Sequence, residues 1–492
     1  MNYKLKSLQP AAVWQYFEDI CQIPHPSKKE EKLGAFLMDF AKKHNLEARQ
    51  DKAGNIIIKK PATKGFENRK TVVMQSHIDM VCEKNADKEF NFDTDAIQPV
   101  IDGDWVRADG TTLGADDGIG VAASLALLVD NTIQHGPLEC LFTVDEETGL
   151  TGAFAIEAGF TSGDILLNLD SEDEGEIFIG CAGGGDTSAV FTYEKQPVLA
   201  NSVACTIWIK GLTGGHSGDE IHKGRGNSIK ILNRFLCEAN NKLSSMHLAE
   251  IGGGNMRNAI PREACATIVI PEKQAGKWKT LFQNLRDDIV NELSVYEPNF
   301  VASWEKAPLP KTVIDVRTQR ALLLSIYACP HGVIAMSGKM PGLVETSTNL
   351  ASVKMNAQKQ TITIATSQRS SIESSKRDVM NMVENVFTLA NAKVKHGNGY
   401  PGWEPNPDSE ILKIAVATYK KLFGKEPVVR AIHAGLECGL FLTKYPHMDM
   451  ISYGPTLRLV HTPEEKIEIS TVDKFWKHTL EILKNIPERI EN

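Results

Sequence analysis

The stretch GTTLGADDGIG, residues 110–120, places two aspartates, Asp116 and Asp117, side by side on a glycine-rich turn. The apolar segment VAASLALLVD, residues 121–130, follows at once and predicts a buried helix. Two like charges on one turn repel each other unless a partner compensates them. A turn that leads into a buried helix is typical of an α/β domain. What compensates the two aspartates must be inferred from other parts of the chain.

Short apolar runs surround this helix in the first 186 residues. They lie at 55–60, 71–76, 138–144 and 164–169. Their alternation with helical segments predicts an α/β fold, with a mixed, largely parallel sheet flanked by helices.

The pattern changes at about residue 187 and again near residue 398. The block between these points shows two cycles of strand-like and helical segments, which leaves open whether it contains two related subdomains. A Pro/Gly/Asn cluster, NGYPGWEPNPDS at 398–409, marks the second boundary, and the α/β pattern returns after it. We therefore expect a discontinuous domain, residues 1–186 and 398–492, with an inserted α/β domain, residues 187–397.

Length and composition exclude several classes of protein. A chain of 492 residues is too long for one ordinary core, so at least two domains are expected. The formal net charge of −8 argues against a nucleic-acid partner, and the sequence contains no apolar run long enough for a membrane span. The nine scattered cysteines form no CxxC pair, and the start of the chain lacks an apolar leader, so we expect a cytoplasmic protein.

Acidic and histidine residues stand where the apolar runs end. Ligands of open α/β sheets bind at the carboxyl ends of the strands. We therefore expect one crevice to collect the following residues: His77, Asp116, Glu146, Glu147, Asp170 and His461.

So many carboxylates and imidazoles cannot share a site without a compensating cation. Histidine and carboxylate ligands suit zinc, and also cobalt or manganese. The number of ligands suits two ions bridged by one carboxylate, about 3.5–4 Å apart. Taken singly, each group has a simpler explanation: Asp116 and Asp117 as a helix cap, and Glu146 and Glu147 as a solvated turn. The combination of strand-end acids favours the metal site.

Seven motifs resemble those of the aminoacyl-histidine dipeptidases, which belong to a wider group of dinuclear zinc exopeptidases and deacylases. They are SHIDMV (76–81), GTTLGADDGIG (110–120), TVDEETG (143–149), NLDSEDEGEIFIGCAGG (168–184), GGHSGDEI (214–221), RNAIPREA (257–264) and IHAGLECGLF (432–441). The resemblance extends from about residue 23 to residue 461. It implies a cytoplasmic dipeptidase of broad, Xaa-His (carnosine-like) specificity, with a catalytic domain and an inserted lid domain.

The resemblance also implies the metal ligands. His77 and Asp170 would be the terminal ligands of one ion, and Glu147 and His461 those of the other. Asp116 would bridge the two ions. We expect two divalent ions, with zinc as the first choice and cobalt or manganese as the alternatives.

Roles in the chemistry follow from the same resemblance. Glu146 would be the general base, and Asp79 would accept a hydrogen bond from His77 and fix its tautomer. The peptide bond between Asp116 and Asp117 would be cis, and Asp117 would lie at the positive end of the following helix.

Substrate contacts are implied mostly in the inserted domain. His216 would stabilise the oxyanion, while Asn258 and Arg369 would bind the carboxylate and backbone of the dipeptide. Gly435 would line the site, with Glu437 near the substrate's amine.

Two alternatives remain open at the level of the sequence. One is a related zinc aminopeptidase, tripeptidase or N-acyl-amino-acid deacylase, and the other is an inactive binding protein on the same fold. The expected partner is a small peptide. The sequence leaves open the physiological dipeptide, the native metal, the choice between monomer and homodimer, and whether His216 acts within its own chain.

Overall fold

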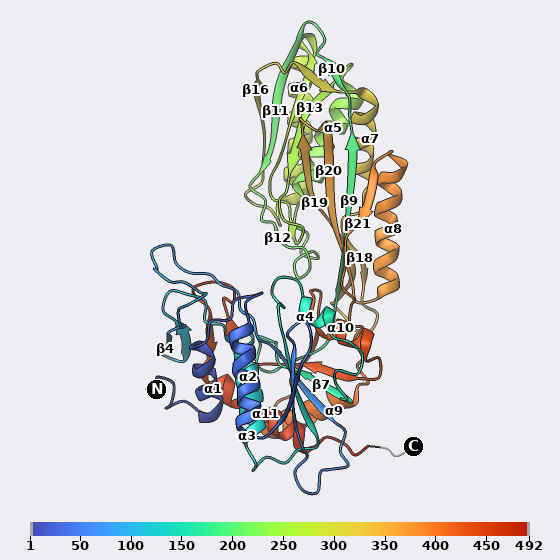
Figure 1. Cartoon of the computed structure of the whole chain (residues 1–492). Helices are drawn as coiled ribbons and strands as arrows, with labels where there is room; N and C mark the ends of the chain where they lie inside the picture. The colour runs from blue at the N-terminus through green and yellow to red at the C-terminus, as the bar shows by residue number, and fades with distance from the viewer. Residues whose placement is uncertain (1–2, 490–492) are drawn as a thin grey trace. The chain divides into compact units, whose positions relative to one another are not determined.

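The computed structural model describes residues 3–489, which divide into two compact units. The first unit comprises the residues up to Gly180, Pro405–Ala431 and the residues from Leu436 onward. The second comprises Cys181–Glu404 and the short return Ile432–Gly435. Each unit has its own sheets and helices (Figure 1).

An eight-stranded sheet with the order β1-β2-β6-β3-β7-β23-β8-β22 is the frame of the first unit. Parallel pairing joins β6, β3, β7 and β23, whereas β1, β2 and β8 run antiparallel to their neighbours. The predicted mixed α/β class is confirmed, with the parallel part confined to the centre. The strands are β1 (Glu47–Gln50), β2 (Ile56–Lys60), β3 (Val72–His77), β6 (Leu138–Thr143), β7 (Ile165–Asn168), β8 (Glu176–Cys181), β22 (Val428–Ile432) and β23 (Asp449–Ser452).

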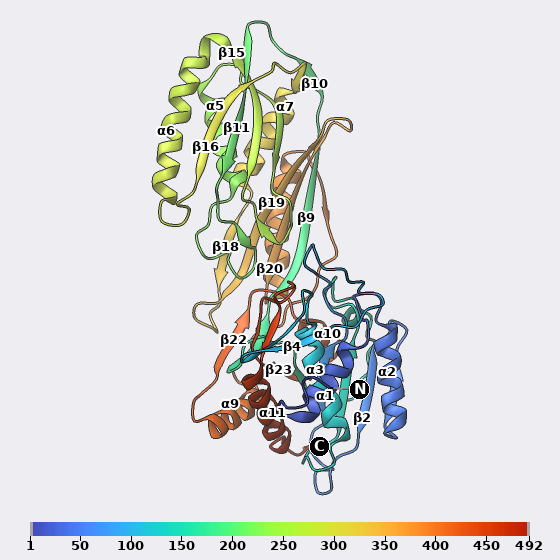
Figure 2. The ribbon, with the colours of Figure 1, turned by 90° about the vertical axis from the view of Figure 1, so that its left-hand side faces the viewer.

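The central strands are buried along their whole length, which explains their continuous apolar runs. Every residue of β3, β6 and β7 is buried, as expected for parallel strands covered on both faces. Helix α3 packs on β3 and against α1, and α9 packs on β23 and against α11 (Figure 2). The helices are α1 (Ala11–Cys21), α2 (Glu31–Lys43), α3 (Ala115–Val129), α4 (Thr151–Ala155), α9 (Glu410–Phe423), α10 (Cys438–Lys444) and α11 (Ile469–Lys484).

A small four-stranded sheet, β24-β25-β5-β4, completes the first unit. It pairs a hairpin from the first half of the chain with two short strands from its end. The strands are β4 (Pro99–Asp102), β5 (Trp105–Ala108), β24 (Leu457–Arg458) and β25 (Lys466–Glu468). The segment between β24 and β25 carries His461.

The second unit is built on a nine-stranded antiparallel sheet, β16-β11-β15-β13-β19-β20-β9-β21, in which β18 also pairs with β19. Its strands are β9 (Gly183–Thr192), β11 (Ser202–Lys210), β13 (His247–Gly253), β15 (Ala264–Pro271), β16 (Val301–Ala307), β18 (Gly332–Met336), β19 (Val344–Asn356), β20 (Thr361–Ser370) and β21 (Lys393–His396). Two short pairs accompany it: β10 (Lys195–Pro197) with β17 (Thr312–Ile314), and β12 (Gly215–His216) with β14 (Ala259–Ile260).

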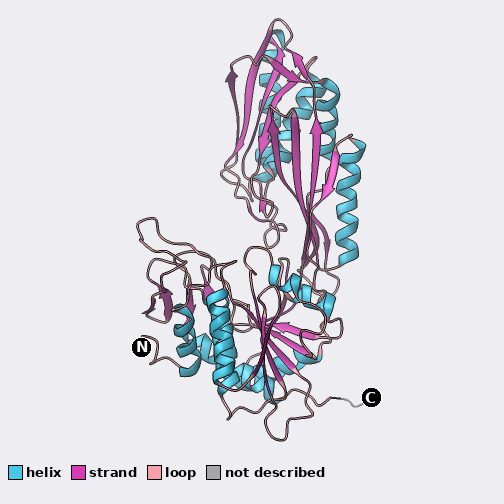
Figure 3. Cartoon of the chain, viewed as in Figure 1, coloured by secondary structure: helices cyan, strands magenta, loops and turns pink. Residues whose placement is uncertain are grey.

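Four helices share one apolar core with this sheet (Figure 3). Alternate residues of β11, Cys205, Ile207 and Ile209, enter the core together with Phe235 of α5 and Phe387 of α8. The period of two that places them there is the strand signal in the sequence. The helices are α5 (Ser228–Lys242), α6 (Ala275–Leu293), α7 (Val316–Ala328) and α8 (Glu373–Leu389), with the 3-10 turn η1 (Glu272–Gln274) before α6.

None of the helices within residues 3–489 combines the length and the hydrophobicity that a membrane span requires.

Candidate metal centre

Three parallel strands end side by side and carry three of the predicted ligand segments. In the sheet, Gln75 of β3 pairs with Asn168 of β7, and His77 pairs with Thr143 of β6. His77 therefore ends its strand level with Asp170, two residues after Asn168. Glu146 and Glu147 follow the end of β6. The parallel register brings these side chains to one edge of the sheet, where the sequence predicts the site.

Asp116 reaches this edge from the start of α3, where Asp116 and Asp117 have non-helical backbone angles. Gly114 adopts a left-handed conformation, and the peptide bond between Asp116 and Asp117 is cis, so the cis bond that the resemblance implied is confirmed. The Asp117 side chain is buried, and its Oδ1 accepts the backbone N–H of Gly120 at 3.2 Å. Asp117 thus caps the first turn of the helix, while Asp116 faces the sheet edge.

The first cluster joins His77, Asp116 and Asp170. His77 Nε2 lies 2.9 Å from Asp116 Oδ1 and 3.4 Å from Asp170 Oδ1. All three groups offer one ligand atom within 4.8 Å of the others. These are the residues that the resemblance assigned to one ion.

The second cluster joins Asp116, Glu147 and His461. His461 Nε2 lies 3.2 Å from Asp116 Oδ2 and 3.0 Å from Glu147 Oε1. Asp116 therefore turns one carboxylate oxygen toward each imidazole: Oδ1 toward His77 and Oδ2 toward His461. A carboxylate so placed suits a bridge between two ions.

Asp79 links the first imidazole to the acidic turn after β6. His77 Nδ1 lies 3.0 Å from the Asp79 backbone oxygen and 3.4 Å from its Oδ1. The Asp79 carboxylate accepts the backbone N–H of Glu146 at 2.9 Å and that of Glu147 at 3.2 Å, and Ser27 donates to it as well. Asp79 thus lies beside the His77 imidazole and also binds the turn that carries both glutamates.

The carboxylates of the two clusters carry more negative charge than the imidazoles of His77 and His461 can neutralise. Burial and the nearby charge of Asp116 raise the pKa of Asp170 well above its ordinary value, and burial with neighbouring carboxylates does the same for Glu146. Hydrogen bonds with Asp116 and Glu147 raise the pKa of His461 to about 11. Divalent cations relieve such crowding. Nitrogen and oxygen donors of this kind fit zinc, cobalt or manganese, so the residues present fit two ions.

Two of the predicted substrate contacts lie together in the second unit. His216 of β12 pairs with Ala259 of β14, the residue directly after Asn258, and the Ser217 backbone N–H donates to the backbone oxygen of Asn258 at 2.8 Å. His216 Nδ1 lies 3.4 Å from Asp219 Oδ2. The His216 side chain is 33% exposed, which leaves it accessible to a ligand.

Arg369 and Gly435 meet at one aromatic ring in the same unit. The buried Arg369 of β20 donates from Nη1 to the Tyr400 hydroxyl at 3.1 Å, and its Nε has no partner. A Cβ at Gly435 would lie 2.7 Å from the Tyr400 ring. Glycine at position 435 permits this close approach of the Tyr400 ring, which lies beside the Arg369 guanidinium.

Glu437 belongs to the first unit and lies under the sheet edge. It is completely buried and accepts hydrogen bonds from Gln75 at 2.6 Å and Thr143 at 2.8 Å. Its Oε1 has no partner, and burial raises its pKa to about 7. The sequence gives no sign of these partners, because Gln75 and Thr143 lie inside apolar strands.

Other residues around these groups escaped the sequence-based prediction. His433 is buried and lies 2.7 Å through Nε2 from Ser347 Oγ, and its Nδ1 has no partner. Glu465 is a buried acid four residues after His461. His433 lies inside the motif IHAGLECGLF, and Glu465 follows the predicted ligand His461 by four residues, so their position near a predicted residue was the available signal.

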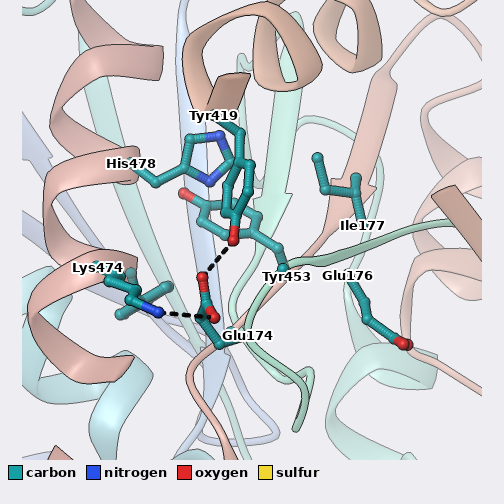
Figure 4. Close-up of a pocket in the computed structure, with 10 residues that line it drawn as sticks. Glu174, Glu176, Ile177, Tyr419, Tyr453, Lys474 and His478 are labelled. Atoms are coloured by element: carbon teal, nitrogen blue, oxygen red, sulfur yellow. Dashed lines mark hydrogen bonds and ion pairs between the residues drawn. The ribbon is translucent and has the colours of Figure 1, made fainter. Parts of the chain in front are cut away.

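A small cavity under α9 and α11 has no room for a substrate. It encloses about 10 Å³, roughly the space of one water molecule. Glu174 accepts hydrogen bonds there from the Tyr419 hydroxyl and from Lys474 (Figure 4). These contacts connect the chain after β7 to the two helices, a structural role.

Most of the chain is similar to one family of peptidases. Residues 73–485 match the model of peptidase family M20/M25/M40. The chain is 43% identical over 486 residues to the cytosol non-specific dipeptidase of Escherichia coli, covering 99% of this chain and 100% of that protein.

Two solved structures illustrate the likeness of fold. The aminoacylhistidine dipeptidase of Vibrio alginolyticus matches with a TM-score of 0.94 and 44% identity, over 99% of each chain. A tripeptidase of Staphylococcus aureus matches with a TM-score of 0.56 and 17% identity, over 97% of this chain and 99% of the other.

Proposed function

The chain belongs to peptidase family M20/M25/M40 and is a hydrolase acting on peptide bonds, and we propose that it is a dinuclear metallo-dipeptidase. The observation that carries the proposal is Asp116, whose two oxygens face His77 and His461 separately. A carboxylate placed in this way can offer one oxygen to each of two ions, which supports a bridged pair.

The ligands of the proposed pair follow the two clusters. His77 and Asp170 would hold one ion, Glu147 and His461 the other, and Asp116 both. Two divalent ions, with zinc first and cobalt or manganese as alternatives, would acidify a water molecule and polarise the scissile carbonyl group.

Glu146 is the proposed general base. It shares a cluster with His77 and Glu147, and its side chain is not required by either ligand set. Its carboxylate would accept a proton as water attacks the carbonyl carbon, and would deliver that proton to the nitrogen as the C–N bond breaks. Asp79 keeps Glu146 in place through the backbone N–H bond.

Recognition of the substrate is proposed for residues of the second unit and for Glu437. The Arg369 Nε has no partner, which supports a role for Arg369 in binding a carboxylate. Asn258 would bind the carboxylate and backbone of the dipeptide together with Arg369. His216 would donate to the developing oxyanion. Glu437 has one free carboxylate oxygen, which supports its proposed contact with the substrate's amine.

The proposed substrates are dipeptides, with Xaa-His peptides such as carnosine among a broad range. The names of the two dipeptidases that share over 40% identity with the chain support this range. The name of the cytosol non-specific dipeptidase of Escherichia coli supports a proposed cytoplasmic location.

A panel of substrates tests the proposal. Rates on carnosine, other dipeptides, a tripeptide and an N-acetyl amino acid would be measured with zinc present. We expect hydrolysis of several dipeptides, including Xaa-His, with much slower turnover of the tripeptide and the N-acetyl compound. Faster turnover of the tripeptide or the N-acetyl compound would instead support an aminopeptidase or a deacylase.

A further inference from the structure

Glu465 is a buried carboxylate whose partners are all backbone N–H groups of one loop. The side chain is 2% exposed. Its Oε2 accepts the N–H groups of Leu113 at 2.8 Å and Gly114 at 3.1 Å, and its Oε1 accepts that of Ala115 at 2.8 Å. The N–H of Asp116 points to the same oxygen at 3.4 Å. These partners lie about 350 residues away in the sequence, so the contact is purely tertiary.

The N–H groups of this loop need acceptors from outside the helix. The loop runs into the non-helical start of α3, and N–H groups at the start of a helix have no acceptor within the helix. The N-cap residue, Gly114, has no side chain to cap them, and its φ of 69° turns successive N–H groups toward one point. Glu465 supplies the missing acceptor with both carboxylate oxygens.

Glu465 also belongs to the segment that presents His461. Leu459 and His461 both have left-handed backbone conformations, and the Glu465 N–H donates to the Thr462 oxygen at 3.0 Å. The segment therefore turns back on itself, and the carboxylate lies a few residues from the imidazole. One side chain joins the loop that carries Asp116 to the turn that carries His461.

We propose that Glu465 is a positioning residue, which holds Asp116 Oδ2 opposite His461 Nε2 so that the second cluster is formed before metal binds. The inference rests on the proposed function, because it concerns ligands of the proposed ion pair. Its consequence is selective: the ion between Glu147 and His461 depends on Glu465 most strongly, because both loops that Glu465 joins contribute to that cluster.

Glu465→Gln tests the inference with little change of volume. The amide retains one acceptor oxygen and turns an NH2 group toward N–H donors. We expect the affinity for the second zinc ion to fall about 10- to 100-fold, the usual effect of losing a partner that orients a metal ligand, while the first ion binds as in the unchanged protein. Glu464→Gln, at the exposed neighbouring position, is the matched control and should bind both ions normally.

Stepwise zinc affinities would be measured by competition with a chromophoric chelator, and thermal unfolding would be followed in excess chelator to check folding. Excess zinc should restore kcat in Glu465→Gln. If that variant does not fold, Glu465→Asp, which keeps both oxygens, gives the same comparison with a smaller expected loss.

Two results would overturn the inference. One is a folded variant, less stable than the unchanged protein, that binds both ions with unaltered affinities. The other is an equal loss of affinity at both sites. Failure of the proposed function is distinguishable from either, since the unchanged protein would then bind fewer than two ions.

Discussion

At the scale of single residues, the chemistry depends on how neighbouring acids are separated. Asp116 turns toward the sheet edge while Asp117 caps the helix through Gly120, so the two adjacent carboxylates have different partners. Glu146 and Glu147 are separated in a similar way. Both backbone N–H groups are bound by Asp79, but only Glu147 lies in the cluster with His461.

Glu146→Gln and Glu147→Gln should distinguish the proposed general base from the proposed metal ligand. The amide keeps size and hydrogen bonding but cannot take a proton, so both metals should remain while kcat falls by about 100- to 10,000-fold, the usual contribution of general acid–base catalysis. Glu147→Gln should instead weaken one metal site, and excess metal should partly restore its rate. Metal content by mass spectrometry and kcat at saturating metal decide between them. A metal lost from Glu146→Gln but kept in Glu147→Gln would reverse the assignments.

Metal binding should release protons. In the metal-free protein the pKa of His461 is about 11, raised by Asp116 and Glu147, so the imidazole is protonated at pH 7. A metal ion binds only the neutral imidazole, and its apparent affinity should therefore rise as the pH rises toward that value. Calorimetric titration with zinc at pH 7, in two buffers of different ionisation enthalpy, counts the protons. His461→Gln should release fewer; an identical heat in both buffers for the unchanged protein would contradict the prediction.

At the scale of elements, the sequence predicted the apolar strands well and the polar strands poorly. The runs at 55–60, 71–76, 138–144 and 164–169 became β2, β3, β6 and β7, because central strands are apolar on both faces. Strand β19 begins well before its apolar run, at Val344, and buries Thr346, Ser347, Thr348 and Asn349. Thr346 bonds to Ser370 of β20 and Ser347 to His433, and no local pattern in the sequence shows these contacts.

The local sequence also does not indicate that the glycine-rich start of β9 is a strand. β9 runs from Gly183 to Thr192 without interruption, although it begins with three glycines. A Cβ at Gly183 or Gly184 would lie within 2.6 Å of the segment around Tyr400. These glycines are therefore required by close packing in a strand, whereas in a sequence alone they indicate a loop.

Gly120→Ala tests the cap that starts α3. A Cβ at Gly120 would lie 2.3 Å from Asp117 Oδ1, so the buried carboxylate must move. We expect the metal-free protein to lose about 1–3 kcal/mol of unfolding free energy, the usual effect of overpacking. Gly118→Ala is the control on the same helix, where the new Cβ would lie 3.4 Å from Phe17, and alanine should be neutral or stabilising. Urea denaturation measures the unfolding free energy of both variants. Equal values for Gly120→Ala and Gly118→Ala would contradict the prediction and show that the Asp117 side chain can move without cost.

At the scale of the whole molecule, the proposed roles are divided between two units. The proposed metal ligands and Glu146 belong to the first unit, while His216, Asn258 and Arg369 belong to the second. The strand-end rule predicted that the first group meets in one crevice, and the resemblance supplied the role of each residue. The second group rested entirely on the resemblance, because a histidine on a glycine turn and an arginine in a strand have no distinctive local pattern.

His216→Ala should separate catalysis from metal binding. His216 belongs to neither metal cluster, so both ions should bind normally, while kcat falls by about 100- to 1,000-fold as when an oxyanion donor is lost. Steady-state kinetics on a dipeptide and zinc content measure the two effects, and His222→Ala at the exposed position nearby is the control. An unchanged kcat would remove His216 from the mechanism.

Hydrolysis by this protein is proposed to require two metal ions, bridged by Asp116. The most direct measurement is a titration of exhaustively demetallated protein with zinc, in which bound metal per chain and the rate on a dipeptide are followed together. We predict no activity without metal and a rate that reaches its plateau at two ions per chain. Full activity in the demetallated protein, or a rate that reaches its plateau at one ion per chain, would show that two ions are not required.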